Sequence, residues 1–178
     1  IIDGDENHLV FGVKRDVTTE HEGEVSTILH DEISEGDMIN LSAPVGGFSI
    51  ENTERPQLFI GSGVGMTPLV SMFKKAASLN VPTQMIQAVV TEDERPFAQK
   101  LDSITDNYEQ AQLHLHVKDK EGYLEAKELE QYLSEQPEIY ICGGTKFLHS
   151  IINSLKELNY DMNHVHFETF IPRLSVQV

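Results

Sequence analysis

The sequence predicts an α/β protein whose main part is a doubly wound, mostly parallel, five-stranded sheet. Two observations favour this fold class. From residue 54 to residue 178, apolar runs alternate with amphipathic runs, as in consecutive βαβ units. A glycine-rich stretch, 61–65, directly follows the first apolar run and directly precedes a helical pattern. Residues 1–53 lack this alternation, so we expect a separate structural unit there.

The elements of the main part follow from hydrophobic spacing. Leu69, Phe73 and Ala76 recur at helical spacing after the glycines, and Ile151 and Leu155 do so in the last helix. In chain order we expect strand 57–61, helix 67–80, strand 83–90, a helix from residue 97, strand 112–117, helix 127–136, strand 138–144, helix 145–159 and strand 164–170.

The first 53 residues predict two strands, 8–15 and 38–48, around a short helix, 23–33. These elements are too few for an independent sheet domain, because an isolated hairpin buries little surface. We therefore expect the chain to begin inside a domain whose earlier strands precede residue 1. The predicted domain boundary lies between residues 53 and 54.

Composition excludes some classes of function. The formal net charge of −16 disfavours nucleic acid as a partner. No run of about 18 to 20 apolar residues suggests a membrane helix, and no targeting segment is visible, so we expect a cytoplasmic protein with no membrane partner. Cys142 is the single cysteine, so a disulfide framework is excluded and a reducing compartment is expected.

The stretch IGSGVGMTP, 60–68, is the strongest functional pattern. A strand that runs through glycines into a helix directs backbone N–H groups and the positive end of the helix dipole at one point, where a pyrophosphate is stabilised. Thr67 is expected to cap the helix and Pro68 to lie in its first turn. Alternatively, the glycines permit close packing of the helix on the strand. The dinucleotide fingerprint would have a further glycine where Thr67 stands.

Three other candidates each have a simpler alternative. Cys142 and Gly143 end a strand at the edge where doubly wound sheets bind ligands, but from the residues alone the favoured interpretation of the thiol is a small buried side chain. Ser26 lies at the start of a helix, either as part of an anion site or in an ordinary surface helix. Glu168 is flanked by phenylalanines, as working carboxylates can be, or it simply faces solvent.

The histidines predict no metal site. His114 and His116 share one strand face, as do His164 and His166, but no accompanying ligand spacing is present. We expect both pairs to lie on solvated strand faces.

Five stretches in order resemble the ferredoxin-NADP reductase superfamily, and most closely the reductase part of bacterial flavohaemoglobins, the nitric oxide dioxygenases. They are GEVS (23–26), APVGGF (43–48), GSGVGMTP (61–68), ICGG (141–144) and FETFIP (167–172). The resemblance spans nearly the whole chain. It implies that residues 1–53 are the last part of an antiparallel FAD-binding β-barrel and that residues 54–178 are an NAD(P)-binding α/β domain.

The resemblance also implies roles for individual residues. Catalytic roles fall on Glu168, which would tune the flavin, and on Cys142, against which the nicotinamide would rest. The residues that would bind the FAD pyrophosphate, the pyridine nucleotide, the nicotinamide or the flavin ring are Gly23, Val25, Ser26, Gly63, Val64, Gly65, Met66, Thr67, Pro68, Cys142, Gly143, Thr169, Phe170, Ile171 and Pro172. No metal ligand is implied.

The sequence departs from the family pattern in several places. Gly144 stands where proline is common, and Ile171 where glycine is common. The R-x-Y-S motif that grips the flavin, and the globin domain that carries haem, are absent from the 178 residues. We therefore expect a fragment of a longer protein.

The function implied by the resemblance is hydride transfer from NADH to FAD, followed by electron transfer to haem in a globin domain of the same full-length chain, where nitric oxide is oxidised to nitrate. NADH is favoured over NADPH because the segment 91–96, TEDERP, is acidic and offers only Arg95 to a 2′-phosphate. Two alternatives remain open: a flavin reductase that serves a separate protein acceptor, and a nucleotide-binding module without catalysis.

Overall fold

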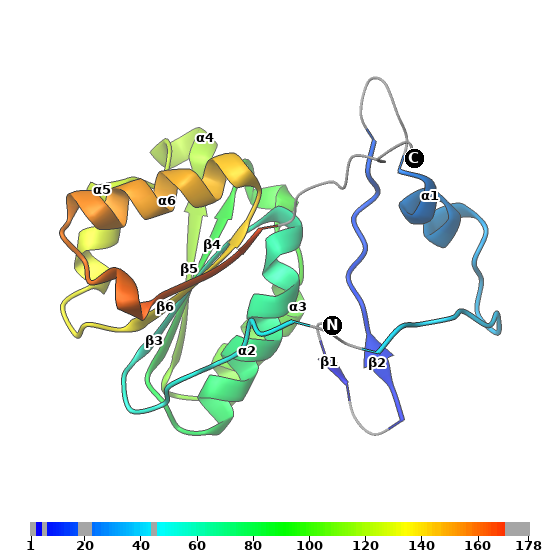
Figure 1. Cartoon of the computed structure of the whole chain (residues 1–178), viewed down its shortest axis with the longest axis horizontal. Coiled ribbons are helices and arrows are strands. Elements are labelled where there is room, and N and C mark those ends of the chain that lie inside the picture. Colours follow the sequence, from blue (N-terminus) through cyan, green and yellow to red (C-terminus); the bar gives the residue numbers. More distant parts are fainter. Residues whose placement is uncertain (1–2, 5–6, 18–22, 44–45, 170–178) are drawn as a thin grey trace.

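The computed structural model describes residues 3–4, 7–17, 23–43 and 46–169. Its main feature is a parallel five-stranded sheet with the strand order β5-β4-β3-β6-β7 (Figure 1). The strands are β3 (Gln57–Ser62), β4 (Thr83–Val89), β5 (Ala111–Val117), β6 (Glu138–Gly143) and β7 (Val165–Thr169). The predicted doubly wound, five-stranded sheet is confirmed.

Helices cover both faces of this sheet (Figure 1). Helices α2 (Met66–Ser78) and α3 (Ala98–Asn107) pack on one face, in a cluster that includes Phe59, Phe73 and Met85. The short α5 (Ala126–Leu129) and α6 (Thr145–Glu157) pack on the other, around Leu58 and Ile141. A further short helix, α4 (Lys118–Glu121), follows β5. Since β3 and β6 are covered on both faces, they are almost continuously apolar.

The predicted helix 127–136 is shorter than expected. Helix α5 ends at Leu129 and continues only as a 3₁₀ turn, Glu130–Tyr132. Gln136 then adopts a left-handed conformation, with φ of 52°, and Pro137 follows it. Neither a left-handed residue nor a proline continues an α-helix, so the chain turns here and enters β6.

The first unit differs from its prediction. Strand β1 (Asp3–Gly4) pairs antiparallel with β2 (Leu9–Val10), and α1 (Glu24–Asp31) confirms the predicted short helix. The strand expected over 38–48 is wrong for the described residues 38–43 and 46–48, which contain no strand, and the strand expected over 8–15 is reduced to β2. No barrel forms among the described residues of this unit. The physical reason is that these apolar segments meet no further strand in the described part of the chain, and Met38 is 98% exposed.

A close backbone contact fixes the start of α2 against β6. A Cβ atom added to Gly65 would lie 2.3 Å from the carbonyl oxygen of Cys142 and 2.5 Å from the nitrogen of Gly143. Both atoms belong to the backbone, so no side chain can move aside. Gly65 therefore allows the turn before α2 to lie directly on the end of β6.

We expect Gly65→Ala to lower the free energy of unfolding by about 3 kcal/mol, the upper end of the usual cost of overpacking. Gly144→Ala is the matched control, because no atom lies within 4 Å of a Cβ at Gly144, and should change stability by less than about 0.5 kcal/mol. Urea unfolding followed by circular dichroism measures both. Equal stability of the two variants would contradict the backbone contact.

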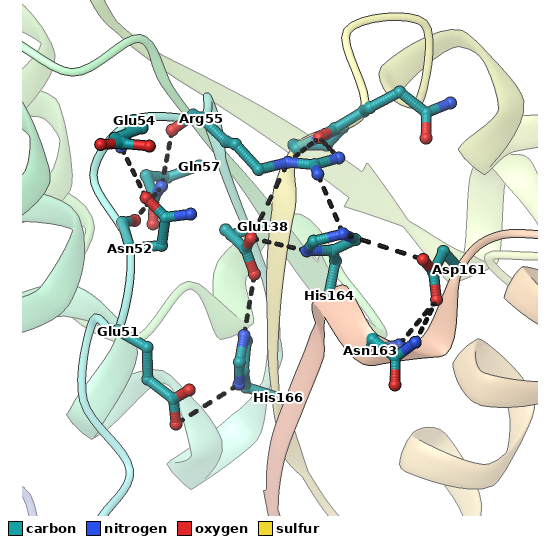
Figure 2. A network of polar contacts seen from close by, with 12 residues as sticks. Glu51, Asn52, Glu54, Arg55, Gln57, Glu138, Asp161, Asn163, His164 and His166 are labelled. Carbon is teal, nitrogen blue, oxygen red and sulfur yellow. Dashed lines mark hydrogen bonds and ion pairs between the residues drawn. The ribbon is translucent and has the colours of Figure 1, made fainter.

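At the opposite end of β6, the buried carboxylate of Glu138 is held by three side chains (Figure 2). His164 Nδ1 lies 2.7 Å from Oε1, and His166 Nε2 lies 2.9 Å from Oε2. Arg55 Nε lies 3.7 Å from Oε1. The expectation that His164 and His166 lie on a solvated strand face is therefore wrong, since both side chains are partly buried against this carboxylate.

The network also fixes the tautomer of His164. Arg55 Nη1 lies 2.9 Å from His164 Nε2, and a guanidinium can only donate. With Nε2 accepting from Arg55, the Nδ1–H of His164 donates to Glu138. Burial by itself would raise the pKa of Glu138, but the hydrogen bonds from His166 and His164 and the electrostatic attraction to both histidines together outweigh burial, so the pKa lies below its ordinary value of 4.5.

The other histidine pair is only partly as expected. His116 is 7% exposed, so the solvated position predicted for it is wrong. Its Nε2–H donates to the carbonyl of Gly122 at 3.0 Å. His114 is partly buried, lies 3.1 Å from the Gln84 side chain and meets the Tyr132 ring edge-on.

Glu138→Gln should lower the free energy of unfolding by about 3 kcal/mol at pH 7, because it leaves buried donors facing a neutral group. Since the pKa of Glu138 is lowered in the folded state, the stabilisation by the carboxylate is present above pH 4.5 and is lost as the pH falls through the folded-state pKa. The gap between wild type and variant should therefore narrow below pH 4.5. Glu51→Gln, in which an exposed carboxylate is changed, should cost less than about 1 kcal/mol. A gap that stays constant down to pH 3 in urea titrations would refute this assignment.

Candidate nucleotide-binding site

The carboxyl edge of the sheet brings several predicted site residues together. Strand register aligns Gly61 of β3 with Cys142 of β6, and Cys142 with Glu168 of β7. Gly143 is aligned in the same way with Thr169. The chain changes direction of winding between β3 and β6, and doubly wound sheets bind ligands beyond the strand ends at that point.

Each glycine of the stretch 61–65, at the end of β3 and in the turn that follows, has its own structural reason. Gly61 lies against the side chains of Met66 and Leu69, and Gly65 lies on the backbone of β6. Gly63 is different: its φ is +56°, and no atom lies within 4 Å of an added Cβ. Two glycines thus serve close packing, as the simpler interpretation holds, while Gly63 leaves the outer side of the turn open.

The first turn of α2 corrects one prediction and confirms another. Gly65 is the N-cap residue, so Thr67 does not cap the helix. Thr67 lies two positions after this N-cap, is 6% exposed, and donates its hydroxyl to the carbonyl of Val64 at 2.9 Å. Pro68 lies in the first turn as expected, where its missing N–H costs nothing.

A cavity of about 460 Å³ borders the open side of this turn, and we call it the turn cavity. It combines a few polar groups with apolar walls. Lys14 is its amine and Glu94 its carboxylate, and among the described residues neither side chain has a hydrogen-bond or ion-pair partner. Other residues that line it are Gly63, Val64, Thr67 and Phe97.

A second cavity of about 460 Å³, which we call the strand-end cavity, lies beyond the ends of β3, β4 and β5. Ser62 lines it, directly before the two turn residues that line the turn cavity, so the glycine turn borders both. Its lining includes His116, Lys118, Tyr123 and Lys146. The Lys118 amine lies 4.6 Å from the centre of the Tyr123 ring.

Sequence reasoning missed most of the residues that line the two cavities outside the turn. Lys14, Lys118 and Tyr123 belong to no pattern considered above, and Glu94 entered only as part of the acidic segment 91–96, in connection with a 2′-phosphate. One signal was available: Glu94 and Lys118 follow the carboxyl ends of β4 and β5, at the edge where ligands bind in such sheets. Lys14 gave no such signal, because its approach to the turn depends on how the first unit folds.

The Cys142 thiol lies inside the core and not on the cavity surface. It is completely buried, and burial, together with the nearby charge of Glu168, raises its pKa to about 12. The thiol is therefore neutral and unreactive at physiological pH, and it lies beneath the turn. Glu168 is only partly buried beside it.

The residues expected to hold the flavin are only partly described. Ser26 is occupied locally: its hydroxyl donates to the carbonyl of Gly23 at 2.9 Å and accepts from the N–H of Asp16 at 3.0 Å. Val25 is 71% exposed. Neither cavity is lined by these residues. Thr169 ends β7, whereas Phe170, Ile171 and Pro172 lie outside the described residues.

Among the described residues, no group of three or more His, Cys, Asp or Glu side chains is arranged to hold a metal ion. No helix in the described part is both long and apolar enough to cross a bilayer.

A parallel sheet with a glycine turn and cavities at its carboxyl edge is typical of nucleotide-binding α/β proteins. A family model described as the oxidoreductase NAD-binding domain matches residues 59–152, more than half of the chain. The chain belongs to this family.

Individual relatives extend the comparison. A flavohemoprotein of Bacillus cereus is 30% identical over 172 residues, which cover 88% of this chain and 43% of that protein. The flavohem-like FAD/NAD-binding domain of nitric oxide dioxygenase from Vibrio cholerae has a TM-score of 0.75 at 27% identity, over 85% of this chain and 66% of that one. A ferredoxin-NADP⁺ reductase from Plasmodium falciparum, crystallised with 2′P-AMP, shares the fold, with a TM-score of 0.70 at 20% identity over 86% of this chain and 68% of that one. The chain thus spans less than half the length of the curated relative.

We expect Cys142 to resist alkylation in the folded protein. With a pKa of about 12, only about one thiol in ten thousand is ionised at pH 8, and burial blocks the reagent as well. Mass spectrometry after iodoacetamide treatment should show an unmodified native chain and full modification in urea. Stoichiometric labelling of the native chain within minutes would show that the thiol is exposed.

Proposed function

We propose that this chain is the nicotinamide-nucleotide-binding part of an NAD(P)H-dependent flavin reductase. Residues 54–178 would bind the dinucleotide, and residues 1–53 would form part of the flavin-binding unit. The single observation that carries the proposal is the open turn at Gly63, which lies at the carboxyl edge of a parallel sheet between two cavities. Membership of the oxidoreductase NAD-binding family supports it.

The described residues fit a dinucleotide. Each cavity has a volume typical of small-molecule sites, and the turn between them can hold a diphosphate because Gly63 has no side chain. The N-terminal end of α2 and the Lys14 amine add positive charge there. We assign the adenosine half to the strand-end cavity, where Tyr123 offers an aromatic surface, and the nicotinamide half to the turn cavity.

Among the described residues, the first turn of α1 is the part of the chain that fits FAD. The backbone N–H groups in the first turn of α1 can bind an anion, but the Ser26 hydroxyl already has local partners.

When bound, the nicotinamide would supply a hydride and the flavin would accept it. The contribution of this chain would be placement: Gly65 on β6 fixes the turn, and the neutral Cys142 thiol provides an uncharged floor beside Glu168.

We propose NADH as the preferred dinucleotide. Arg95, the single arginine of the segment 91–96, is engaged by Asp102 at 2.9 Å and points toward Gln87. In the strand-end cavity, the Lys118 amine lies over the Tyr123 ring and Glu125 contributes a carboxylate. Segment 91–96 therefore offers a 2′-phosphate no free guanidinium, while the amines in the strand-end cavity are those of Lys118 and Lys146.

For the longer protein we propose electron transfer from flavin to haem in a globin domain of the same chain, with nitric oxide dioxygenation as the activity and the cytoplasm as its location. The flavohemoprotein relatives, of which this chain matches 43%, support a globin partner. The similarity to a nitric oxide dioxygenase domain supports the activity.

Isothermal titration of the purified chain with NADH tests the dinucleotide site. Gly63→Val should weaken binding at least tenfold, because a branched side chain would fill the open face of the turn. Gly36→Val is a matched control: Gly36 also has positive φ, at 99°, and open surroundings, but it lies away from both cavities. Each substitution should cost about 1–2 kcal/mol of stability through backbone strain. If the unmodified chain fails to bind millimolar NADH, or if both variants bind equally, the proposed site is wrong.

A further inference from the structure

One wall of the turn cavity is a short segment, 94–97, whose Arg95 and Pro96 make polar contacts with the buried side chain of Gln87. Gln87 of β4 is completely buried, and its amide nitrogen donates to the carbonyl of Pro96 at 2.8 Å. Its amide oxygen lies 3.4 Å from Arg95 Nε. Phe97 is held in a left-handed conformation, with φ of 61°, which is costly for an aromatic residue. The wall is therefore fixed by its surroundings.

Only one of the three acidic residues in the turn 92–94 belongs to the cavity. Glu92 is paired with Lys120 at 2.6 Å, and Asp93 lines neither cavity. Glu94 lines the turn cavity and has no partner among the described side chains. The neighbouring Arg95 cannot neutralise it, because its guanidinium is bound to Asp102. A free carboxylate on a fixed wall thus borders the open side of the glycine turn.

The polar groups of this cavity complement a specific ligand chemistry. The turn amides and Lys14 offer donors to an anion, whereas Glu94 offers acceptors to hydroxyl groups. A phosphate joined to a sugar with two neighbouring hydroxyls satisfies both requirements. Carboxylates recognise ribose hydroxyls in other dinucleotide sites by accepting their hydrogen bonds.

We infer that Glu94 binds the hydroxyl groups of the ribose that carries the nicotinamide. The inference rests on the proposed function, since it assumes that the diphosphate lies on the glycine turn. It assigns Glu94 a role in holding the nicotinamide half of the cofactor in the turn cavity, where the ring would lie toward Cys142 and Glu168.

Three ligands and two variants test this inference by titration calorimetry. NADH and ADP-ribose contain the second ribose, and ADP lacks it. Glu94→Gln should weaken binding of NADH and of ADP-ribose about tenfold, because a charge-assisted pair of hydrogen bonds is lost, and should leave ADP unchanged. Asp93→Asn removes the same charge from the adjacent position and should leave all three affinities unchanged. Both side chains are exposed, and equal melting temperatures would confirm that the variants fold.

Several outcomes would overturn the inference while the proposed function stands. Unchanged or tighter NADH binding by Glu94→Gln would show that the carboxylate does not hold the ribose. An equal loss for ADP would place Glu94 at the diphosphate or adenosine instead. If Asp93→Asn weakened binding of NADH and ADP-ribose as much as Glu94→Gln does, the loss would come from the overall negative charge of the turn and not from contacts of Glu94. If the unmodified chain binds neither NADH nor ADP-ribose, the proposed function fails and this inference fails with it.

Discussion

The backbone contact between Gly65 and the end of β6 is the constraint on which the candidate site depends. Because a Cβ at Gly65 would collide with the Cys142 carbonyl, only glycine lets the turn rest on the neighbouring strand. That contact sets the position of α2, whose side chains fill one face of the sheet. It also turns the open side of Gly63 outward, toward the turn cavity. Packing and ligand access are thus two results of one glycine motif.

Sequence reasoning recovered the elements whose evidence is local. The five strands and the long helices α2 and α6 follow from apolar runs and from helical spacing, and their boundaries lie within two residues of the expected ones. Prediction failed where structure depends on distant partners. Segment 38–48 has the composition of a strand, but its described residues pair with no other described strand. The sequence alone places His166 on a solvated strand face, because its partner Glu138 comes close only once β6 and β7 are in register.

The same distinction applies to the candidate site. The glycine turn could be found from sequence because its chemistry and its geometry lie in consecutive residues. The turn cavity could not, because Lys14, Gly63 and Glu94 come from three segments that only the fold brings together. Thr67 shows a subtler limit. Its identity suggested a helix cap, yet the glycines allow the helix to begin earlier, so its hydroxyl bonds to Val64 within the turn.

The arrangement around Glu138 has an evolutionary consequence. Arg55 can donate to His164 only while His164 keeps its proton on the other nitrogen, and that proton is directed at Glu138. Each of the three side chains thus needs its neighbour as a hydrogen-bond partner, so the effects of substitutions at these positions on stability are not additive. Replacement of one side chain alone leaves the other two without one of their hydrogen-bond partners. Descendant sequences should therefore either keep the trio intact or exchange it together for an apolar set, and intermediate combinations should be scarce.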